Sequence, residues 1–297
     1  MTLSSTAEGH MQGTDQRTAY ACQACGSSSE PRLCYRKSGY PIRRCNECGL
    51  GSTGLSADFD PTGIYSRGYF SGGQNDGYAD YPGSEPVLRK EFRSALRRLK
   101  AAGRSDGKLF EIGCAYGFFL LEATRTFQVS GIEMCEEAAD HCRRRGLDVS
   151  TGFAAEEELA RKGPFDAVVM LDVIEHLPDP WHVLCLAHRH LSPGGHLMIT
   201  TGDWESIASR VMGPSWRLMT PPQHVFFFSR KNIHTILARA GFRVLELTRP
   251  GKLVPVNLAL YQMLRILGVK PRTFPLLNNV GIPINLFDAM CVIAVRE

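Results

Sequence analysis

The chain has 297 residues, of which 43% are hydrophobic and 22% charged, proportions that are ordinary for a soluble globular protein. Its formal net charge of +4, from 34 basic and 30 acidic residues, is too small to indicate nucleic-acid binding by itself. The longest apolar stretch is interrupted by Asn257, Gln262 and Arg265, so no segment has the roughly 20 apolar residues of a membrane-spanning helix.

The beginning of the chain is polar and lacks the apolar core of a secretory signal, so residues 1–19 are predicted to form a disordered tail. Four of the ten cysteines fall in two Cys-x-x-Cys pairs and the others are scattered. This distribution favours a reduced protein with a metal site over a disulfide scaffold, and therefore a cytoplasmic location.

The two cysteine pairs predict a zinc ribbon over residues 20–52. Cys22 and Cys25 precede Cys45 and Cys48, and a glycine follows each pair directly. Four thiolates fill a tetrahedral site and leave no open position, so the zinc is expected to be structural. A module of about 30 residues is too small to fold on its own core, so the metal would supply its stability. A redox role for either pair is the alternative.

The segment 53–85 is rich in glycine, tyrosine and aspartate and has no clear period, which predicts a structured loop or lid. Residues 86–101 then place apolar side chains at helical spacing. The other face of this predicted helix is basic. We interpret that face as solvated rather than as a nucleic-acid stripe, because the period locates only the buried side.

From residue 108 onward, strand-like and helix-like segments alternate, which predicts a parallel sheet wound on both faces by helices. Strands are expected over 108–114, 128–134, 147–153, 165–173, 195–202, 242–249 and 289–297. Helices are expected over 118–127, 136–146, 181–191 and 229–241, the last with Ser229 as its N-cap and Gly241 after its end.

The loop after the first of these strands carries Gly113 and Gly117, where the backbone can approach a ligand closely. It is not the dinucleotide fingerprint, because Phe118 and its neighbour crowd the turn that a pyrophosphate needs. Glu111 adds a negative charge just before the turn. The loop therefore predicts a ligand with a positive centre and no phosphates.

Glu133 ends the second strand, 22 residues after Glu111. A carboxylate at that position can accept both hydroxyls of a ribose. A ribose, a positive centre and no phosphate together describe S-adenosylmethionine. The alternative for Glu133 is an acid that caps the following helix.

These motifs, together with FDAVVMLDVIEHLPDP and LSPGGHLMIT, resemble the successive motifs of class I S-adenosylmethionine-dependent methyltransferases over about residues 86–297. The resemblance implies an α/β, Rossmann-like methyltransferase sheet of seven strands, whose last strand inserts antiparallel beside the fifth. The small zinc-ribbon module would precede this domain. Ala115 stands where the family usually has glycine, which is the smallest possible departure.

The resemblance also implies which residues surround the cofactor. The glycine loop would face its methionine part, Glu133 its ribose and Met134 its adenine, although plain core packing is as good a reading for Met134. Tyrosines of the lid, including Tyr65 and Tyr78, could cover the sulfonium with an aromatic face, or simply pack together. The predicted cofactor set is Glu111, Gly113, Ala115, Gly117, Glu133, Met134, Phe153, Ala154, Asp172 and Val173, with Tyr69 and Tyr81 from the lid.

Two histidines are candidates for a general base, because the ordinary imidazole pKa suits proton removal near neutral pH. His176 follows the fourth strand, where substrate would meet cofactor. His224 lies in a TPPQH segment that resembles one found in a broad subgroup of these enzymes. A structural, hydrogen-bonded histidine is the alternative at each position.

The predicted function is methyl transfer from S-adenosylmethionine to the oxygen or carbon of a small molecule, for example a sugar or another secondary metabolite. An RNA base methyltransferase with a zinc module is the alternative, and a binder without catalysis is disfavoured by the intact acids and glycines of the loop. No nucleic-acid partner is expected, and the oligomeric state is not predicted. The apolar loop 250–287 could line a substrate pocket or touch a membrane surface.

Overall fold

The computed structural model describes residues 21–56, 59–60, 70, 80–266, 269 and 274–297. The predicted tail and most of the predicted lid, including Tyr65, Tyr69 and Tyr78, lie outside the described residues.

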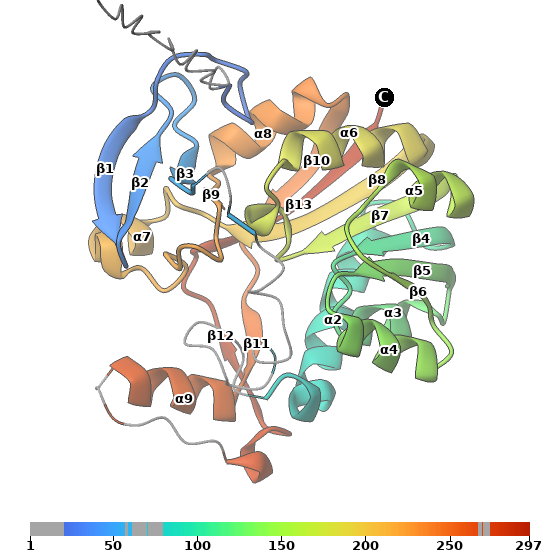
Figure 1. Cartoon of the computed structure of the whole chain (residues 1–297). Helices are drawn as coiled ribbons and strands as arrows, with labels where there is room; N and C mark the ends of the chain where they lie inside the picture. Colours follow the sequence, from blue (N-terminus) through green and yellow to red (C-terminus); the bar gives the residue numbers. More distant parts are fainter. Residues whose placement is uncertain (1–20, 57–58, 61–69, 71–79, 267–268, 270–273) are drawn as a thin grey trace, which may run out of the picture.

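A seven-stranded sheet forms the centre of the molecule, with the order β10-β13-β8-β7-β4-β5-β6 (Figure 1). The strands β4 to β8 run parallel, and β13 lies antiparallel between β8 and β10. The predicted sheet, with an antiparallel last strand beside the fifth, is therefore confirmed. Its strands are β4 (Gly107–Ile112), β5 (Phe127–Glu133), β6 (Asp148–Thr151), β7 (Phe165–Leu171), β8 (Leu191–Gly202), β10 (Phe242–Thr248) and β13 (Ala289–Arg296).

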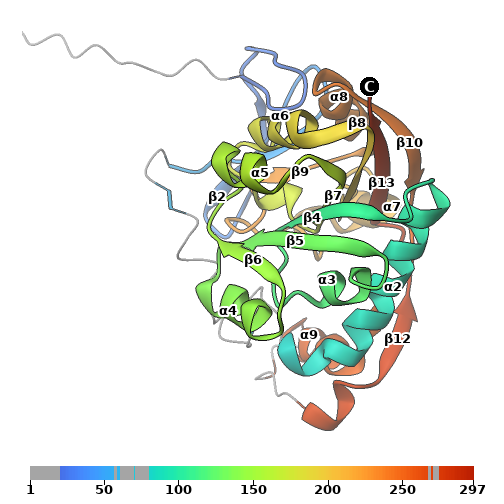
Figure 2. The same cartoon turned by 90° about the vertical axis from the view of Figure 1, so that its right-hand side faces the viewer.

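Helices cover both faces of this sheet (Figure 2). The middle strand β7 is apolar and almost fully buried along its length, as expected of a parallel strand packed on both sides. One face packs against α5 (Glu156–Lys162), α6 (Pro180–His190) and α8 (Arg230–Arg239). The other face packs against α2 (Glu85–Ala101), α3 (Phe118–Ala123) and α4 (Glu136–Arg144).

Several predicted boundaries differ from the structure by one or two residues, and two differ by four. The helix expected over 118–127 ends at Ala123, because Thr124 caps it and the chain turns into β5 at Phe127. The strand expected from residue 195 begins at Leu191, because Leu191 pairs with Phe165 and a register shift carries the Ser-Pro-Gly-Gly turn within the strand.

The apolar segment 250–287, expected to be a loop, contains regular structure. It forms β11 (Lys252–Pro255), α9 (Val256–Ile266), the 3-10 turn η5 (Pro275–Leu277) and β12 (Gly281–Ile284). The strands β11 and β12 pair antiparallel, so the segment is a hairpin with a helix inserted in it. Within the described residues, no helix is long and apolar enough to cross a membrane.

A second sheet of four strands joins the cysteine-rich region to the rest of the chain (Figure 1). It contains β1 (Arg32–Lys37), β2 (Tyr40–Arg44) and β3 (Gly51–Thr53), and its fourth strand is β9 (Phe226–Phe227). The short helices α7 (Ile207–Met212), η3 (Ile174–His176) and η4 (Gly213–Ser215) lie in the connections that follow β7 and β8, and η2 (Pro82–Ser84) precedes α2.

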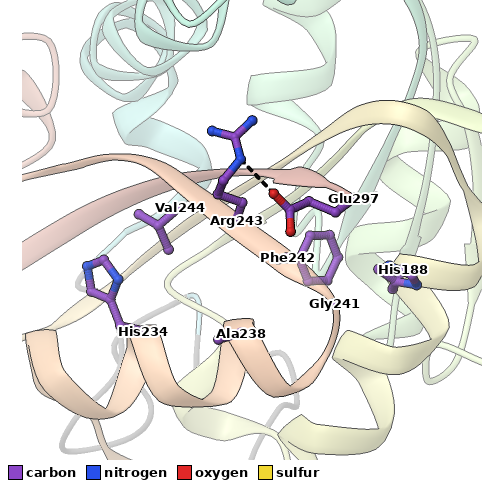
Figure 3. Close-up of a pocket in the computed structure, with 8 residues that line it drawn as sticks. All are labelled: His188, His234, Ala238, Gly241, Phe242, Arg243, Val244 and Glu297. Carbon is purple, nitrogen blue, oxygen red and sulfur yellow. Dashed lines mark hydrogen bonds and ion pairs between the residues drawn. The ribbon is translucent and has the colours of Figure 1, made fainter.

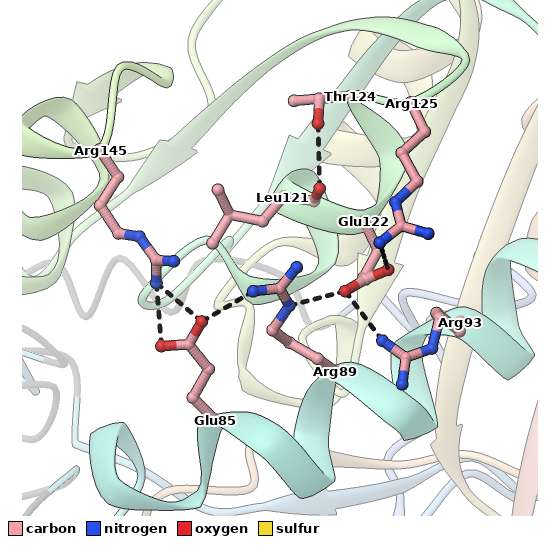
Figure 4. Close-up of polar contacts among 8 residues, drawn as sticks. All are labelled: Glu85, Arg89, Arg93, Leu121, Glu122, Thr124, Arg125 and Arg145. Atoms are coloured by element: carbon pink, nitrogen blue, oxygen red, sulfur yellow. Dashed lines mark hydrogen bonds and ion pairs between the residues drawn. The ribbon is translucent and has the colours of Figure 1, made fainter.

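Part of the basic face of α2 is not simply solvated, which corrects the expectation (Figure 4). The Glu122 side chain of α3 is buried, and one of its oxygens contacts Arg89 at 2.6 Å and Arg93 at 3.0 Å. Arg145 pairs with Glu85 at 2.9 Å near the start of α2. These ion pairs attach α2 to α3 and to the end of α4. Arg89 and Arg93 are therefore already paired with a carboxylate, which makes them less available to bind the phosphates of a nucleic acid.

Candidate active site

The loop between β4 and α3 has the geometry that its glycines predict. Gly113 and Gly117 adopt φ angles of +72° and +74°, a region that favours glycine. A Cβ built on Gly113 would lie 2.6 Å from the Val173 side chain, so the loop also requires glycine for space. Ala115 takes φ of +47° without being a glycine. The backbone here therefore bends tightly at the carboxyl end of β4.

The Glu111 side chain lies beneath this bend. It is 3% exposed, and its Oε2 atom has no hydrogen-bond partner among the described residues. Burial, with smaller contributions from Cys142 and Glu133, raises its pKa well above the usual range. An unpartnered buried carboxyl next to a tight bend fits a cofactor that brings a positive charge to this loop.

Glu133 connects the bend to the next helix. Its Oε2 accepts a hydrogen bond from the Ala115 N–H and its Oε1 accepts one from the Cys135 N–H, both at 2.8 Å. Burial raises its pKa, while these backbone donors act in the opposite direction. Each carboxylate oxygen has a second lone pair, so the contact with the helix start leaves acceptor capacity for ribose hydroxyls.

The other predicted cofactor residues have mixed environments. Met134 is half-buried and Ala154 packs on the core, whereas Phe153 is 49% exposed. Tyr81 is buried and stacks on Phe118 with a centroid distance of 5.5 Å, within an aromatic cluster. Aromatic packing therefore accounts for the position of Tyr81 in this structure.

Asp172 follows β7 and, like Ala115, has a positive φ, of +56°. Its N–H donates to the Thr200 carbonyl at 3.0 Å, and its Oδ1 accepts from the Thr200 hydroxyl at 2.9 Å. Burial opposes its charge, but an ion pair with Lys252 and the Thr200 hydroxyl outweigh burial and lower its pKa. Lys252 comes from β11, and the sequence reading missed it because 80 residues separate the two partners.

His176 and His224 lie together, although 48 positions separate them in the sequence. Their ring centroids are 4.6 Å apart. The His176 Nδ1 lies 2.9 Å from the Gln223 carbonyl oxygen, and the His224 Nδ1 lies 2.7 Å from the Leu218 carbonyl oxygen. Because a carbonyl oxygen only accepts, each Nδ1 carries the hydrogen, and in the neutral ring Nε2 keeps its lone pair.

Glu175 completes this group and was also missed by the sequence reading. Burial, followed by the charge of Asp172, raises its pKa to about 8, and it is only 4% exposed. Burial and the neighbouring His176 lower the pKa of His224 to about 3, and burial lowers that of His176. At neutral pH the group therefore contains two neutral imidazoles and a protonated carboxyl.

The ligand atoms of Glu175, His176 and His224 all lie within 4.8 Å of one another. Neutral imidazole nitrogens next to a carboxyl can accept and pass on a proton, and the same donor set could hold a divalent cation. The sequence signals for this cluster were the dipeptide Glu-His shortly after a buried strand and the TPPQH segment that carries His224.

The four predicted metal ligands also meet. The Cys22 and Cys48 sulfurs are 3.6 Å apart, and those of Cys25 and Cys45 are 3.7 Å apart. All four cysteines are free, and their sulfurs lie within 4.8 Å of one another. Zinc–sulfur bonds of about 2.3 Å in a tetrahedron require sulfurs about 3.8 Å apart, so the four thiols fit a zinc ion.

A separate depression lies between the end of α8 and the start of β10 (Figure 3). Its lining includes His188 and His234, and the Arg243–Glu297 ion pair of 2.7 Å crosses it. Ligands of such sheets bind at the carboxyl ends of the parallel strands. This depression lies at the opposite edge of the sheet, where β10 begins. No predicted site residue lines it.

The strand order, the glycine bend after β4 and the acid at the end of β5 define the class of this domain, a class I S-adenosylmethionine-dependent methyltransferase domain. A family profile described as "Methyltransferase domain" matches residues 87–247, which is more than half of the chain. The chain belongs to this methyltransferase family.

Curated relatives and a solved structure agree with this assignment. A ubiquinone biosynthesis O-methyltransferase from Caulobacter vibrioides is 36% identical over 39% of this chain and 48% of its own length. A protein of the same name from Marinobacter nauticus is 30% identical over 51% of this chain and 68% of its own. The chain thus spans about half the length of the Caulobacter relative. A SAM-dependent methyltransferase from Archaeoglobus fulgidus shares the fold, with a TM-score of 0.50 and 18% identity over 70% of this chain and 94% of that one.

Proposed function

We propose that this protein transfers a methyl group from S-adenosylmethionine to an oxygen atom of a small-molecule acceptor. The observation that carries the proposal is the arrangement at the carboxyl edge of the sheet, where a buried carboxyl and a glycine bend lie on one side and two neutral histidines on the other. The names of the relatives favour oxygen over carbon as the methylated atom. The RNA alternative has no such support.

In this proposal the bend Gly113–Gly117 and Glu133 hold the cofactor, and Asp172 and Val173 close the pocket. The positive charge of the bound cofactor would lower the raised pKa of Glu111, whose carboxylate then balances that charge. When bound, the cofactor supplies an electrophilic methyl group. The chain's own residues align the acceptor, since orientation accounts for much of the rate of such a displacement. The Nε2 lone pair of His176 or His224 accepts the proton of the acceptor hydroxyl, and the neighbouring Nδ1–H remains bonded to its carbonyl. Burial keeps both rings neutral and able to accept a proton, but a pKa of about 3 makes His224 the weaker base of the two.

The test is transfer of a labelled methyl group from S-adenosylmethionine to metabolite extracts in the presence of the purified protein. We expect label in a compound that passes a small-pore filter and survives nuclease treatment. Label that disappears with nuclease would support RNA methylation instead, and cofactor binding without any labelled product would support a non-catalytic binder.

We further propose that the four thiolates of Cys22, Cys25, Cys45 and Cys48 hold one structural zinc ion in a ribbon that precedes the methyltransferase domain. The sulfur separations support this reading. We predict about one zinc per chain by metal analysis of reduced protein, and its loss in Cys45→Ser. The exposed Cys34 is a matched control, because Cys34→Ser should keep the metal. Zinc-free native protein would contradict the ribbon.

A further inference from the structure

The strand β3 of the cysteine-rich region is continuous with the second cysteine pair. The Cys45 N–H donates to the Leu50 carbonyl at 2.9 Å, and the Gly49 N–H donates to the Cys45 carbonyl at 3.1 Å. Only two residues, Gly49 and Leu50, separate Cys48 from the first residue of β3. The conformation of this knuckle therefore sets where β3 begins and in which direction it runs.

This strand lies directly against the segment that carries His224. Gly51 pairs with Phe227, and Ser52 pairs with Phe226 in an antiparallel ladder. A Cβ on Gly51 would lie 2.2 Å from the Trp204 ring, so only glycine permits this approach. The ladder is thus a close backbone contact between the ribbon and the methyltransferase domain.

Thr53, the last residue of β3, extends this contact to His224, the candidate base. The Thr53 N–H donates to the Val225 carbonyl at 2.8 Å, and the Thr53 hydroxyl donates to the His224 carbonyl at 2.6 Å. Thr53 is 6% exposed, so water does not easily replace this hydroxyl. On the other side of the segment, the Val225 N–H donates to the Glu175 carbonyl at 2.8 Å.

We propose that Thr53 is a positioning residue for methyl transfer and that the cysteine-rich region acts through it as part of the active-site scaffold. The segment around His224 is a connection between β8 and α8, and it is held between β3 on one side and the Glu175 backbone on the other. Loss of the Thr53 hydroxyl removes the one bond on the β3 side that reaches His224 itself, while the Thr53 N–H bond to Val225 remains, and the His224 ring then shifts relative to His176. This inference rests on the proposed function of His224 as a base.

The test uses protein labelled with ¹³C at the Cε1 atoms of histidine, in which the His224 resonance is assigned by its absence in His224→Gln. We expect Thr53→Val, which keeps the shape and loses the hydroxyl, to move this resonance and to lower kcat about tenfold or more with little change in cofactor affinity. Thr53→Ser keeps a hydroxyl and should restore both. Zinc content, which reports on the fold of the ribbon, should stay at one per chain in each variant.

Thr235→Val is a matched control, because the Thr235 hydroxyl also donates to a backbone carbonyl, at 3.0 Å, but on the surface of α8. It should leave the His224 resonance and kcat unchanged. An unmoved resonance and full turnover in Thr53→Val would overturn the positioning role and leave the proposed function intact. Full turnover in His224→Gln would instead remove His224 as the base, while the resonance experiment would still report whether Thr53 holds the ring.

Discussion

The backbone of the bend Gly113–Gly117 is held by hydrogen bonds within a single β-α-β stretch, whereas the segment of His224 is held by hydrogen bonds from two distant parts of the chain and one nearby carbonyl. Glu133, which follows the bend by only 16 residues, binds its backbone directly. His224 instead depends on Thr53, Glu175 and the Leu218 carbonyl. The proposed cofactor side is therefore a local structure, and the proposed acceptor side is an assembled one. We therefore expect substitutions that are distant in the sequence to disturb the position of His224 more than the conformation of the bend.

The largest expected effect is on the assembled side. We predict that His224→Ala or His176→Ala lowers turnover by about 10² to 10⁴, the usual contribution of a general base, with cofactor affinity nearly unchanged. Steady-state kinetics with an acceptor identified by the methyl-labelling experiment, together with calorimetric titration of S-adenosylmethionine, would measure both quantities. His182→Ala, at an exposed position on α6, is the control. Full activity in both single variants would mean that neither histidine is the base.

A smaller effect is expected at the bend and Glu133, where a substitution should weaken cofactor binding rather than lower turnover. Glu133→Ala removes the predicted ribose acceptor and should weaken cofactor binding at least tenfold, about 1.4 kcal/mol, whereas saturating cofactor should recover much of the turnover. Glu136→Ala, three residues further on and exposed, should bind normally. Unchanged affinity in Glu133→Ala would remove the ribose assignment.

The smallest effect concerns how the assembled side responds to pH. The folded-state pKa of Glu175 is raised to about 8, above its value in the unfolded chain, so its protonated form stabilises the fold at low pH. That contribution is lost as the pH rises from about 5 to about 8. The glutamine of Glu175→Gln cannot ionise. We therefore predict that the free energy of unfolding of this variant, minus that of the native protein, increases as the pH rises over this range in denaturant titrations.

A parallel pH dependence in the two proteins would contradict the buried, protonated state of Glu175. Glu157→Gln, at an exposed position in the first turn of α5, should follow the native protein throughout and serves as the control.

This difference also explains what the sequence could predict. Buried strands such as Phe165–Leu171 and the glycines of the bend follow from local patterns, so the sheet and the two acids were found. The pairing of β3 with β9 was not foreseen, because β9 is two residues long and its partner lies about 175 positions earlier. Lys252 was missed for the same reason, since its Asp172 partner is brought to it only by the β11–β12 hairpin.

The hairpin segment 250–287 shows a second limit of prediction from the sequence. Its residues are apolar and punctuated by prolines, which suggested an irregular loop. The buried side chains of Asn257 and Asn278 form a hydrogen bond of 2.6 Å, which fastens the start of α9 to the residue after η5. The periodicity of apolar residues in the sequence cannot predict a contact between two individual polar side chains.

The two-residue strand β9 has a consequence for any shortened form of the protein. Phe227 packs with Ile42, Trp216 and Met219 beneath the small sheet, and among the described residues its strand pairs with β3 alone. A chain that began at residue 86 would keep every motif of the methyltransferase family but would uncover this edge and its aromatic neighbours. Such an edge is a template for intermolecular strand pairing, so the trimmed enzyme should aggregate rather than work as an independent catalyst.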